Sequence, residues 1–218
     1  VVFGGTITTN TWTHFAVTRS SGNVRLFLSG TQVGSTTSYT ATMPSSVNIT
    51  IGDNSAGTES WNGYLDELRI TGGEPMMSPS LWRLLDWFET QGERINPNMR
   101  LAINSNLVPK AELFEKFLDK CKKIKNLHIY TSNESMYAHS DYIRDGMDYT
   151  RWYVNFVNVI NQIRPAGLHN MCTINALCME SLPEFLDVIV RNKLDAKRVY
   201  GVDVNFTLNI LTKVASTS

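Results

Sequence analysis

The sequence has few cysteines and no net charge. Its 218 residues include three cysteines, Cys121, Cys172 and Cys178, and this odd, widely spaced set argues against a disulfide framework or a zinc site. Acidic and basic residues number 20 each, so no net field favours nucleic acid or an anionic membrane. No apolar run approaches the roughly 20 residues that span a bilayer. These absences predict a cytoplasmic protein with reduced thiols and without a nucleic-acid or membrane partner.

The composition changes partway along the chain. Residues 1–66 contain no Lys and no Cys and are rich in Thr, Ser and Gly, whereas the remainder is rich in Lys, Leu, Met and Phe. Within the first segment, residues 12–17 and 24–28 alternate with the period of half-buried strands, and turn residues follow at 20–23 and 29–30. Two domains of different origin are therefore predicted, and the first consists of the antiparallel hairpins of a sandwich.

Four short sequence motifs of this segment follow one another along the chain, at residues 12–19, 24–30, 51–52 and 62–70. In that order residues 1–70 resemble the C-terminal half of a laminin-G-like, concanavalin-A-like jelly roll. The resemblance implies an all-β sandwich without its N-terminal half, and a glycan as partner. Such domains sometimes hold calcium through loop carboxylates, for which Asp53 is the candidate, although an acid in a Gly-rich loop more often forms a turn.

After Gly73 the pattern becomes one of helices alternating with short apolar strands. Leu81, Leu84 and Leu85 share one helical face, with Ser78 as N-cap and Pro79 at the first helical position. The same spacing predicts three more helices, around residues 114–121, 156–163 and 182–189, and strands are predicted at 99–103, 127–130, 171–174 and 202–208. This alternation predicts a parallel sheet with right-handed crossovers, either open or part of a barrel. Ligands of such sheets bind at the carboxyl ends of the strands.

A Gly-Gly-Glu-Pro motif, Gly72 to Pro75, follows an apolar strand at residues 68–70. Two glycines allow backbone carbonyls to approach an ammonium group closely, and the carboxylate of Glu74 supplies charge beside it. A turn that merely connects a strand to a helix is the alternative interpretation. The motif resembles the second strand of the radical S-adenosylmethionine (SAM) core, and residues 129–135 and 142–146 look like its fourth strand and the segment after it.

The resemblance covers residues 68–212 and is closest to radical SAM proteins with a twitch-type extension. It implies that residues 68–218 form a partial (β/α)6 barrel that lacks its first strand. It also implies a SAM site, in which the Gly-Gly-Glu-Pro segment meets the amino group, Ser132 the ribose and Arg144 the carboxylate, with Asn175 at the end of the fifth strand. The implied cofactor-binding residues are Gly72, Gly73, Glu74, Pro75, Ser132, Arg144 and Asn175. A strand-end cap is the alternative role for Ser132 and Asn175, and a surface ion pair for Arg144.

The iron–sulfur motif of that family is missing. Radical SAM enzymes hold a [4Fe–4S] cluster by three cysteines in a loop after the first strand, which corresponds to a position upstream of Leu68, where this chain has no cysteine. Cys172 and Cys178 do not reproduce that compact loop. We therefore expect a fragment of a radical SAM enzyme, of unassigned substrate, that holds no cluster, is inactive as it stands and binds SAM weakly. The alternatives are a glycan-binding or adhesion module and a non-functional chimera joined within residues 66–75, a tract that fits both families.

Overall fold

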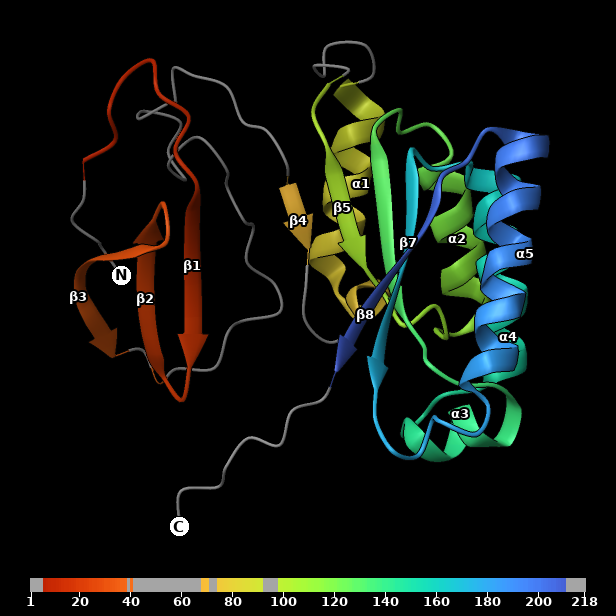
Figure 1. The fold of residues 1–218 in the computed structure, drawn as a ribbon. Coiled ribbons are helices and arrows are strands. Elements are labelled where there is room, and N and C mark those ends of the chain that lie inside the picture. The colour runs from red at the N-terminus through yellow and green to blue at the C-terminus, as the bar shows by residue number, and fades with distance from the viewer. Residues whose placement is uncertain (1–5, 39, 41–67, 71–73, 92–97, 211–218) are drawn as a thin grey trace. The chain divides into compact units, whose positions relative to one another are not determined.

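The chain separates into two compact units, Val1–Val47 and Asn48–Ser218, which are described one at a time (Figure 1). The structure is a computed structural model, and it describes residues 6–38, 40, 68–70, 74–91 and 98–210. The predicted domain boundary at residues 68–70 adjoins segment 41–67, which lies outside the described residues, so that boundary stays a prediction.

The N-terminal unit contains a three-stranded antiparallel sheet in the order β1-β2-β3. Its strands are β1 (Phe15–Ser20), β2 (Asn23–Leu28) and β3 (Thr31–Ser38). Two-residue turns connect them, and both residues of each turn have positive φ: 48° and 75° at Ser21 and Gly22, 47° and 84° at Ser29 and Gly30. Such turns match the right-handed twist of paired strands. The predicted antiparallel hairpins are confirmed.

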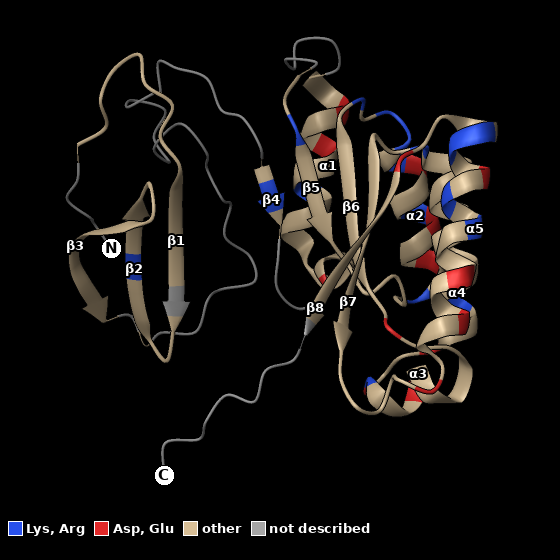
Figure 2. Cartoon of the chain, viewed as in Figure 1, with Lys and Arg blue, Asp and Glu red and all other residues tan. Residues whose placement is uncertain are grey.

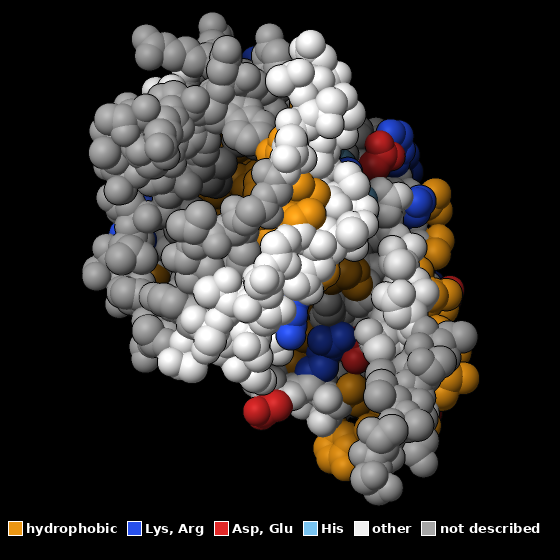
Figure 3. Space-filling view, turned by 90° about the vertical axis from the view of Figure 1, so that its left-hand side faces the viewer, with side chains coloured by type: hydrophobic (Ala, Val, Ile, Leu, Met, Phe, Trp, Pro, Cys, Tyr) orange, Lys and Arg blue, Asp and Glu red, His pale blue; other side chains and the backbone are white. Residues whose placement is uncertain are grey.

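One face of this sheet is apolar. Phe15 lies opposite Leu28, and Val17 lies opposite Leu26, so these four side chains share a face. Phe15 and Val17 are nevertheless 50% and 58% exposed. In Figure 3 hydrophobic side chains are open to view among mostly uncharged polar ones. Within the part of the unit that the structure describes, the sheet is thus a single layer, and the second layer of a jelly roll stays a prediction.

The C-terminal unit contains a five-stranded sheet in the order β4-β5-β6-β7-β8, and each pair of neighbours is parallel. The strands are β4 (Leu68–Ile70), β5 (Leu101–Asn104), β6 (Leu127–Ser132), β7 (Gly167–Ile174) and β8 (Val204–Ile210). The helices are η1 (Pro75–Met77), α1 (Pro79–Gln91), α2 (Ala111–Cys121), α3 (Tyr137–Ile143), α4 (Tyr149–Asn158), η3 (Val159–Ile163) and α5 (Leu182–Tyr200). The predicted strands and the four long helices are confirmed, whereas α3 was not predicted.

The helices that follow the strands lie together on one face of the sheet (Figure 1). A right-handed crossover between sequential parallel neighbours always returns on the same side, so this placement follows from the strand order. On that side Leu101, Ile103 and Ile129 of the strands belong to one core with Phe117 and Phe156 of the helices. The other face is open within the described residues. A parallel α/β sheet is therefore shown, and its closure toward a barrel remains a proposal.

Local signals fix the ends of the helices. The Ser78 hydroxyl accepts a hydrogen bond from the Ser80 amide at 3.3 Å, and Pro79 is the first residue of α1, as predicted. Helix α5 ends at Gly201, whose φ of 72° is the left-handed conformation that glycine adopts without strain. None of the helices that the structure describes combines the length and apolar character needed to cross a membrane.

We expect Phe117→Ala to lower the free energy of unfolding of the C-terminal unit by about 3 to 5 kcal/mol, because it leaves a cavity in the core. Phe117 lies on α2 and is fully buried. Urea denaturation followed by circular dichroism measures the change. Glu115→Ala on the same helix is the control, since Glu115 is exposed, and a loss of similar size in both variants would contradict this view of the core.

Candidate functional site

Polar residues follow four neighbouring strands of the parallel sheet. Glu74 comes after β4, Ser105 and Asn106 after β5, Glu134 after β6 and Asn175 after β7. The carboxyl ends of parallel strands meet at one edge of a sheet, so these residues lie along one rim. This rim, the carboxyl-end rim, is the candidate functional site.

Glu74 is fixed at the rim by hydrogen bonds to the end of the next strand. Its carboxylate accepts from the Ser105 hydroxyl, at 3.0 Å to each oxygen, and from the Asn106 amide at 2.9 Å. It also accepts from the Met76 amide at 3.1 Å and so caps η1. Gly72 and Gly73 lie outside the described residues, while Pro75 is buried as the first residue of η1. The carboxylate therefore joins the ends of β4 and β5.

The environment of Glu74 makes its ionised form less favourable than that of a carboxyl group in water. Burial raises the pKa of this carboxyl, and the hydrogen bonds from Met76, Asn106 and Ser105 oppose that rise only in part. A positive charge at the rim would stabilise the ionised form. The carboxylate is thus suited to receive a cationic group.

A buried ion pair lies after β6. The Arg144 guanidinium donates from Nε to both oxygens of Glu134, at 3.0 Å each, and from Nη2 to one of them. The Glu134 side chain is only 3% exposed, whereas that of Arg144 is 28% exposed. A carboxylate buried to this degree needs such a partner, because an unpaired charge there is strongly destabilising. Arg144 therefore has a structural role at the rim, and its outer edge reaches solvent.

Asn133 organises the backbone beneath this ion pair. Its side-chain oxygen accepts from the Glu134 amide, the Ser135 amide and the Ser140 hydroxyl. The amide of Asn170 on β7 donates to the Asn133 carbonyl at 2.8 Å. Ser140 is part of α3, so this network ties α3 to the end of β6 and to the middle of β7.

Ser132 and Asn175 occupy neighbouring strands of the rim. Asn175 forms an Asx turn, because its side-chain oxygen accepts from the Leu177 amide at 2.9 Å while its amide donates to the Thr173 carbonyl at 3.2 Å. Ser132, the last residue of β6, is half-buried and pairs in register with Met171. The structure thus places Glu74, Ser132, Arg144 and Asn175 at or beside one rim, and their ligand contacts stay predictions.

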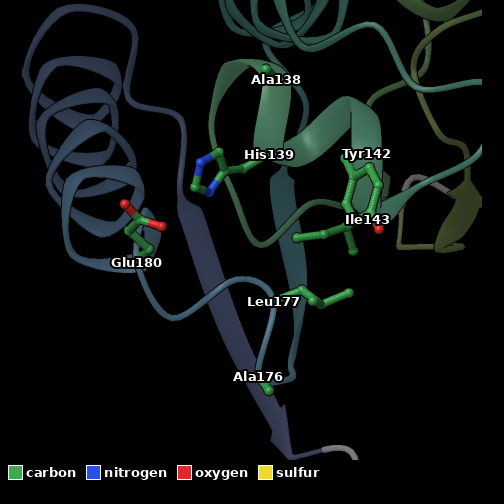
Figure 4. A pocket seen from close by; sticks show the side chains of 7 residues that line it. All are labelled: Ala138, His139, Tyr142, Ile143, Ala176, Leu177 and Glu180. Carbon is green, nitrogen blue, oxygen red and sulfur yellow. The ribbon is translucent and has the colours of Figure 1, made fainter.

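A pocket of about 410 Å³ adjoins the rim between α3 and the segment after β7. In Figure 4 the His139 ring and the Glu180 carboxylate lie on one side of it, and Ile143 and Leu177 lie on the other. Ile143 precedes Arg144 in the chain, so the pocket begins beside a predicted site residue. The sequence analysis missed His139 and Glu180, since they belong to no motif and 41 residues separate them.

The cysteines do not fit an iron–sulfur cluster. Cys121, Cys172 and Cys178 are all buried, and they lie on α2, on β7 and in the turn after β7. Burial raises the pKa of the Cys121 thiol, and it raises that of Cys172 to about 12, so neither is poised to become the thiolate that binds iron. Among residues 6–38, 40, 68–70, 74–91 and 98–210, no three His, Cys, Asp or Glu side chains form a metal-binding group.

Ser105 is the residue on which the position of Glu74 depends most directly. Ser105→Ala should raise the pKa of Glu74 further, because the lost hydrogen bond is one of those that lower it. At pH values above that pKa, we expect this substitution to lower the free energy of unfolding by about 1 to 3 kcal/mol. The loss should shrink as the pH falls through it, since a protonated carboxyl depends less on the donor.

Carbon-13 NMR titration of the glutamate carboxyls, with denaturation at two pH values, measures both effects. Ser132→Ala is the matched control, because the Ser132 hydroxyl makes no hydrogen bond within the described part of the chain. A Glu74 titration that is the same in wild type and Ser105→Ala would show that the hydroxyl does not hold the carboxylate.

Comparisons with known proteins support the two units to different degrees. A family model described as the concanavalin A-like lectin/glucanases superfamily matches residues 1–74, which confirms the predicted resemblance of the N-terminal segment. The crystal structure of Streptococcus suis SuiB matches with a TM-score of 0.51 and 15% identity, over 69% of this chain and 30% of that one. No curated protein matches. The N-terminal third is therefore concanavalin A-like in sequence, and the chain shares part of its fold with SuiB.

Proposed function

We propose that the C-terminal unit binds SAM at the carboxyl-end rim, as a fragment of a radical SAM core. The observation that carries this proposal is the Glu74 carboxylate, which follows a Gly-Gly pair and is held at the rim by Ser105 and the Asn106 amide. The sequential parallel sheet supports it, because a barrel of alternating strands and helices is built in that order.

Four of the seven predicted residues are assigned roles in this proposed site. Glu74 offers a charged partner for the ammonium of the methionine moiety, and a charge-assisted hydrogen bond to it is stronger than a neutral one. Arg144 uses Nε and Nη2 for Glu134, so its remaining nitrogen, Nη1, is left for the ligand carboxylate. Ser132 at the end of β6 and Asn175 just after β7 meet the ribose side. The pocket beside Ile143 provides an apolar wall for the rest of the ligand.

The proposed site binds SAM without cleaving it reductively. In the radical SAM family the cluster supplies the electron, and the cysteines of this chain are too dispersed and too deeply buried to hold one. No step through a cluster follows for this chain. Because a cluster would also bind the amino and carboxylate groups of SAM, its absence should leave a dissociation constant of about 1 mM or weaker.

Glu74→Gln should weaken SAM binding by about tenfold, because it removes the negative charge that faces the ammonium while preserving the shape of the side chain. Binding should also weaken as the pH falls through the raised pKa of Glu74. Isothermal titration calorimetry at high protein concentration measures the affinity. Glu112→Gln is the control, since Glu112 is exposed on α2. Equal affinity of wild type and Glu74→Gln would show that SAM binds at another place or does not bind.

The N-terminal unit supports a second function, the binding of a glycan. The match of residues 1–74 to the concanavalin A-like lectin/glucanases superfamily favours it, and Trp12, 72% exposed, offers a flat apolar surface of the kind that suits a sugar ring.

A glycan array probed with the labelled full chain tests this second function. We expect Trp12→Ala to lose the signal, and Trp87→Ala, which removes a 45% exposed tryptophan from α1, to keep it. A blank array would leave the N-terminal unit without this function. Absence of both glycan and SAM binding would leave the non-functional chimera as the remaining interpretation.

A further inference from the structure

The open face of the parallel sheet carries a cluster of basic and aromatic side chains. Alternate residues of a strand point to opposite faces, so the neighbours of the buried Ile103, Ile129 and Leu168 face away from the helices. The set on the open face includes Arg69 of β4, Asn104 of β5, His128 and Tyr130 of β6 and His169 of β7. We call these five residues the open-face cluster.

Strand register brings the cluster together. Arg69, Ala102, His128 and Gly167 pair in one row across four strands, and Asn104, Tyr130 and His169 pair in the next. The small residues of the first row leave room for the large ones. A Cβ atom at Gly167 would lie 2.6 Å from His128 Nδ1 and 2.7 Å from His169 Nε2, so glycine is what allows both rings to occupy this part of the face.

The side chains of the cluster form a stacked column. The Tyr130 and His169 rings are 4.3 Å apart and almost parallel, at 9°. The Arg69 guanidinium carbon lies 4.4 Å from the centre of the Tyr130 ring. His128 Nδ1 lies 3.0 Å from His169 Nε2, and Arg100, which precedes β5, donates to the Tyr130 hydroxyl at 2.6 Å. Each member is therefore held in place by another.

Among the residues that the structure describes, the charged side chains on this face are basic. None of the five strands contains an Asp or a Glu, and in Figure 2 the acidic residues that are coloured red in this unit lie on helices and connections. Arg69 and Arg100 bring two guanidinium groups beside His169. Burial first, then His128 and these two arginines, lower the pKa of His169 to about 4. Burial and the neighbouring cations thus both disfavour the charged imidazolium form of His169.

Arg69 is the member best placed to bind a ligand. Its side chain is exposed, and a guanidinium has five N–H donors in a fixed fork. Within the described part of the chain it makes one hydrogen bond, to the Asn104 side chain at the long distance of 3.5 Å, and no ion pair. A cation that is stacked in place, with most of its donors not used among the described residues, can bind an oxyanion.

We propose that the open-face cluster binds the phosphate or carboxylate group of a small anionic molecule, with Arg69 as the principal contact and the His128–His169 pair beside it. This site is separate from the carboxyl-end rim in both residues and charge. Anion binding by the cluster does not depend on SAM binding at the rim. If one of the two proposals fails its test, the other still stands.

The test is an NMR titration of the full chain, carrying histidine labelled with carbon-13 and nitrogen-15, against inorganic phosphate and, separately, acetate. Chloride holds the ionic strength constant. We expect a saturable change in the His169 ring signals and a rise in the pKa of His169 above its value of about 4, because a bound anion stabilises the imidazolium. Phosphate alone, acetate alone or both would identify the oxyanion class.

Arg69→Gln should raise the dissociation constant for the bound anion at least about tenfold. Arg191→Gln, which removes an exposed arginine from α5 on the helical layer, should leave the constant unchanged. Amide spectra of both variants verify the fold. No saturable change with either anion, or equal binding by wild type and Arg69→Gln, would overturn the proposal.

Discussion

The order of the parallel strands is the constraint on which the C-terminal unit depends. Because β4 to β8 are neighbours in sequence order, every right-handed crossover passes over the same side of the sheet. Alternate side chains of each strand are thus buried under helices, and those between them face a side that no described helix covers. The same order aligns all carboxyl ends, so Glu74 and Ser105 meet at 3.0 Å although 31 residues separate them. Rim, core and open face all follow from one connectivity.

Much of this fold could be predicted because its signals are local. The periodic apolar faces of α1, α2, α4 and α5, the Ser78 cap and the hairpin turns each depend on residues close in sequence. Helix α3 was missed because Tyr137–Ile143 is short and has no apolar face of helical period; a buried network through Ser140 holds it instead. The polar rim was predictable in position, since Asn104 to Asn106 follow a strand. An ion pair was the alternative role predicted for Arg144, but its partner Glu134 was not predictable, because the pairing depends on where α3 ends.

The tract Leu68–Ile70 belongs to two patterns at once. The family match of the N-terminal segment extends through residue 74, yet Leu68, Arg69 and Ile70 pair in parallel with β5 as the first described strand of the other unit. Alternation explains how one tract fits both patterns. Leu68 and Ile70 are packed against the core of the α/β unit, and Arg69 between them points outward, which is also the pattern of a strand in a sandwich. Pairing with β5 and packing against this core decide in favour of the parallel sheet.

Zero net charge conceals a separation of charge within this sheet. The carboxyl-end rim carries the carboxylates of Glu74 and Glu134, and only the second is neutralised by an arginine. The open face carries Arg69 and no acid from any of the five strands. A carboxylate whose pKa is raised gains from an approaching cation, and a histidine whose pKa is lowered gains from an approaching anion. The two groups with shifted pKa values, Glu74 and His169, therefore have opposite charge preferences on one sheet. At Glu74 the shift comes from burial, and at His169 it comes from burial beside other basic groups. Neither preference follows from the overall composition.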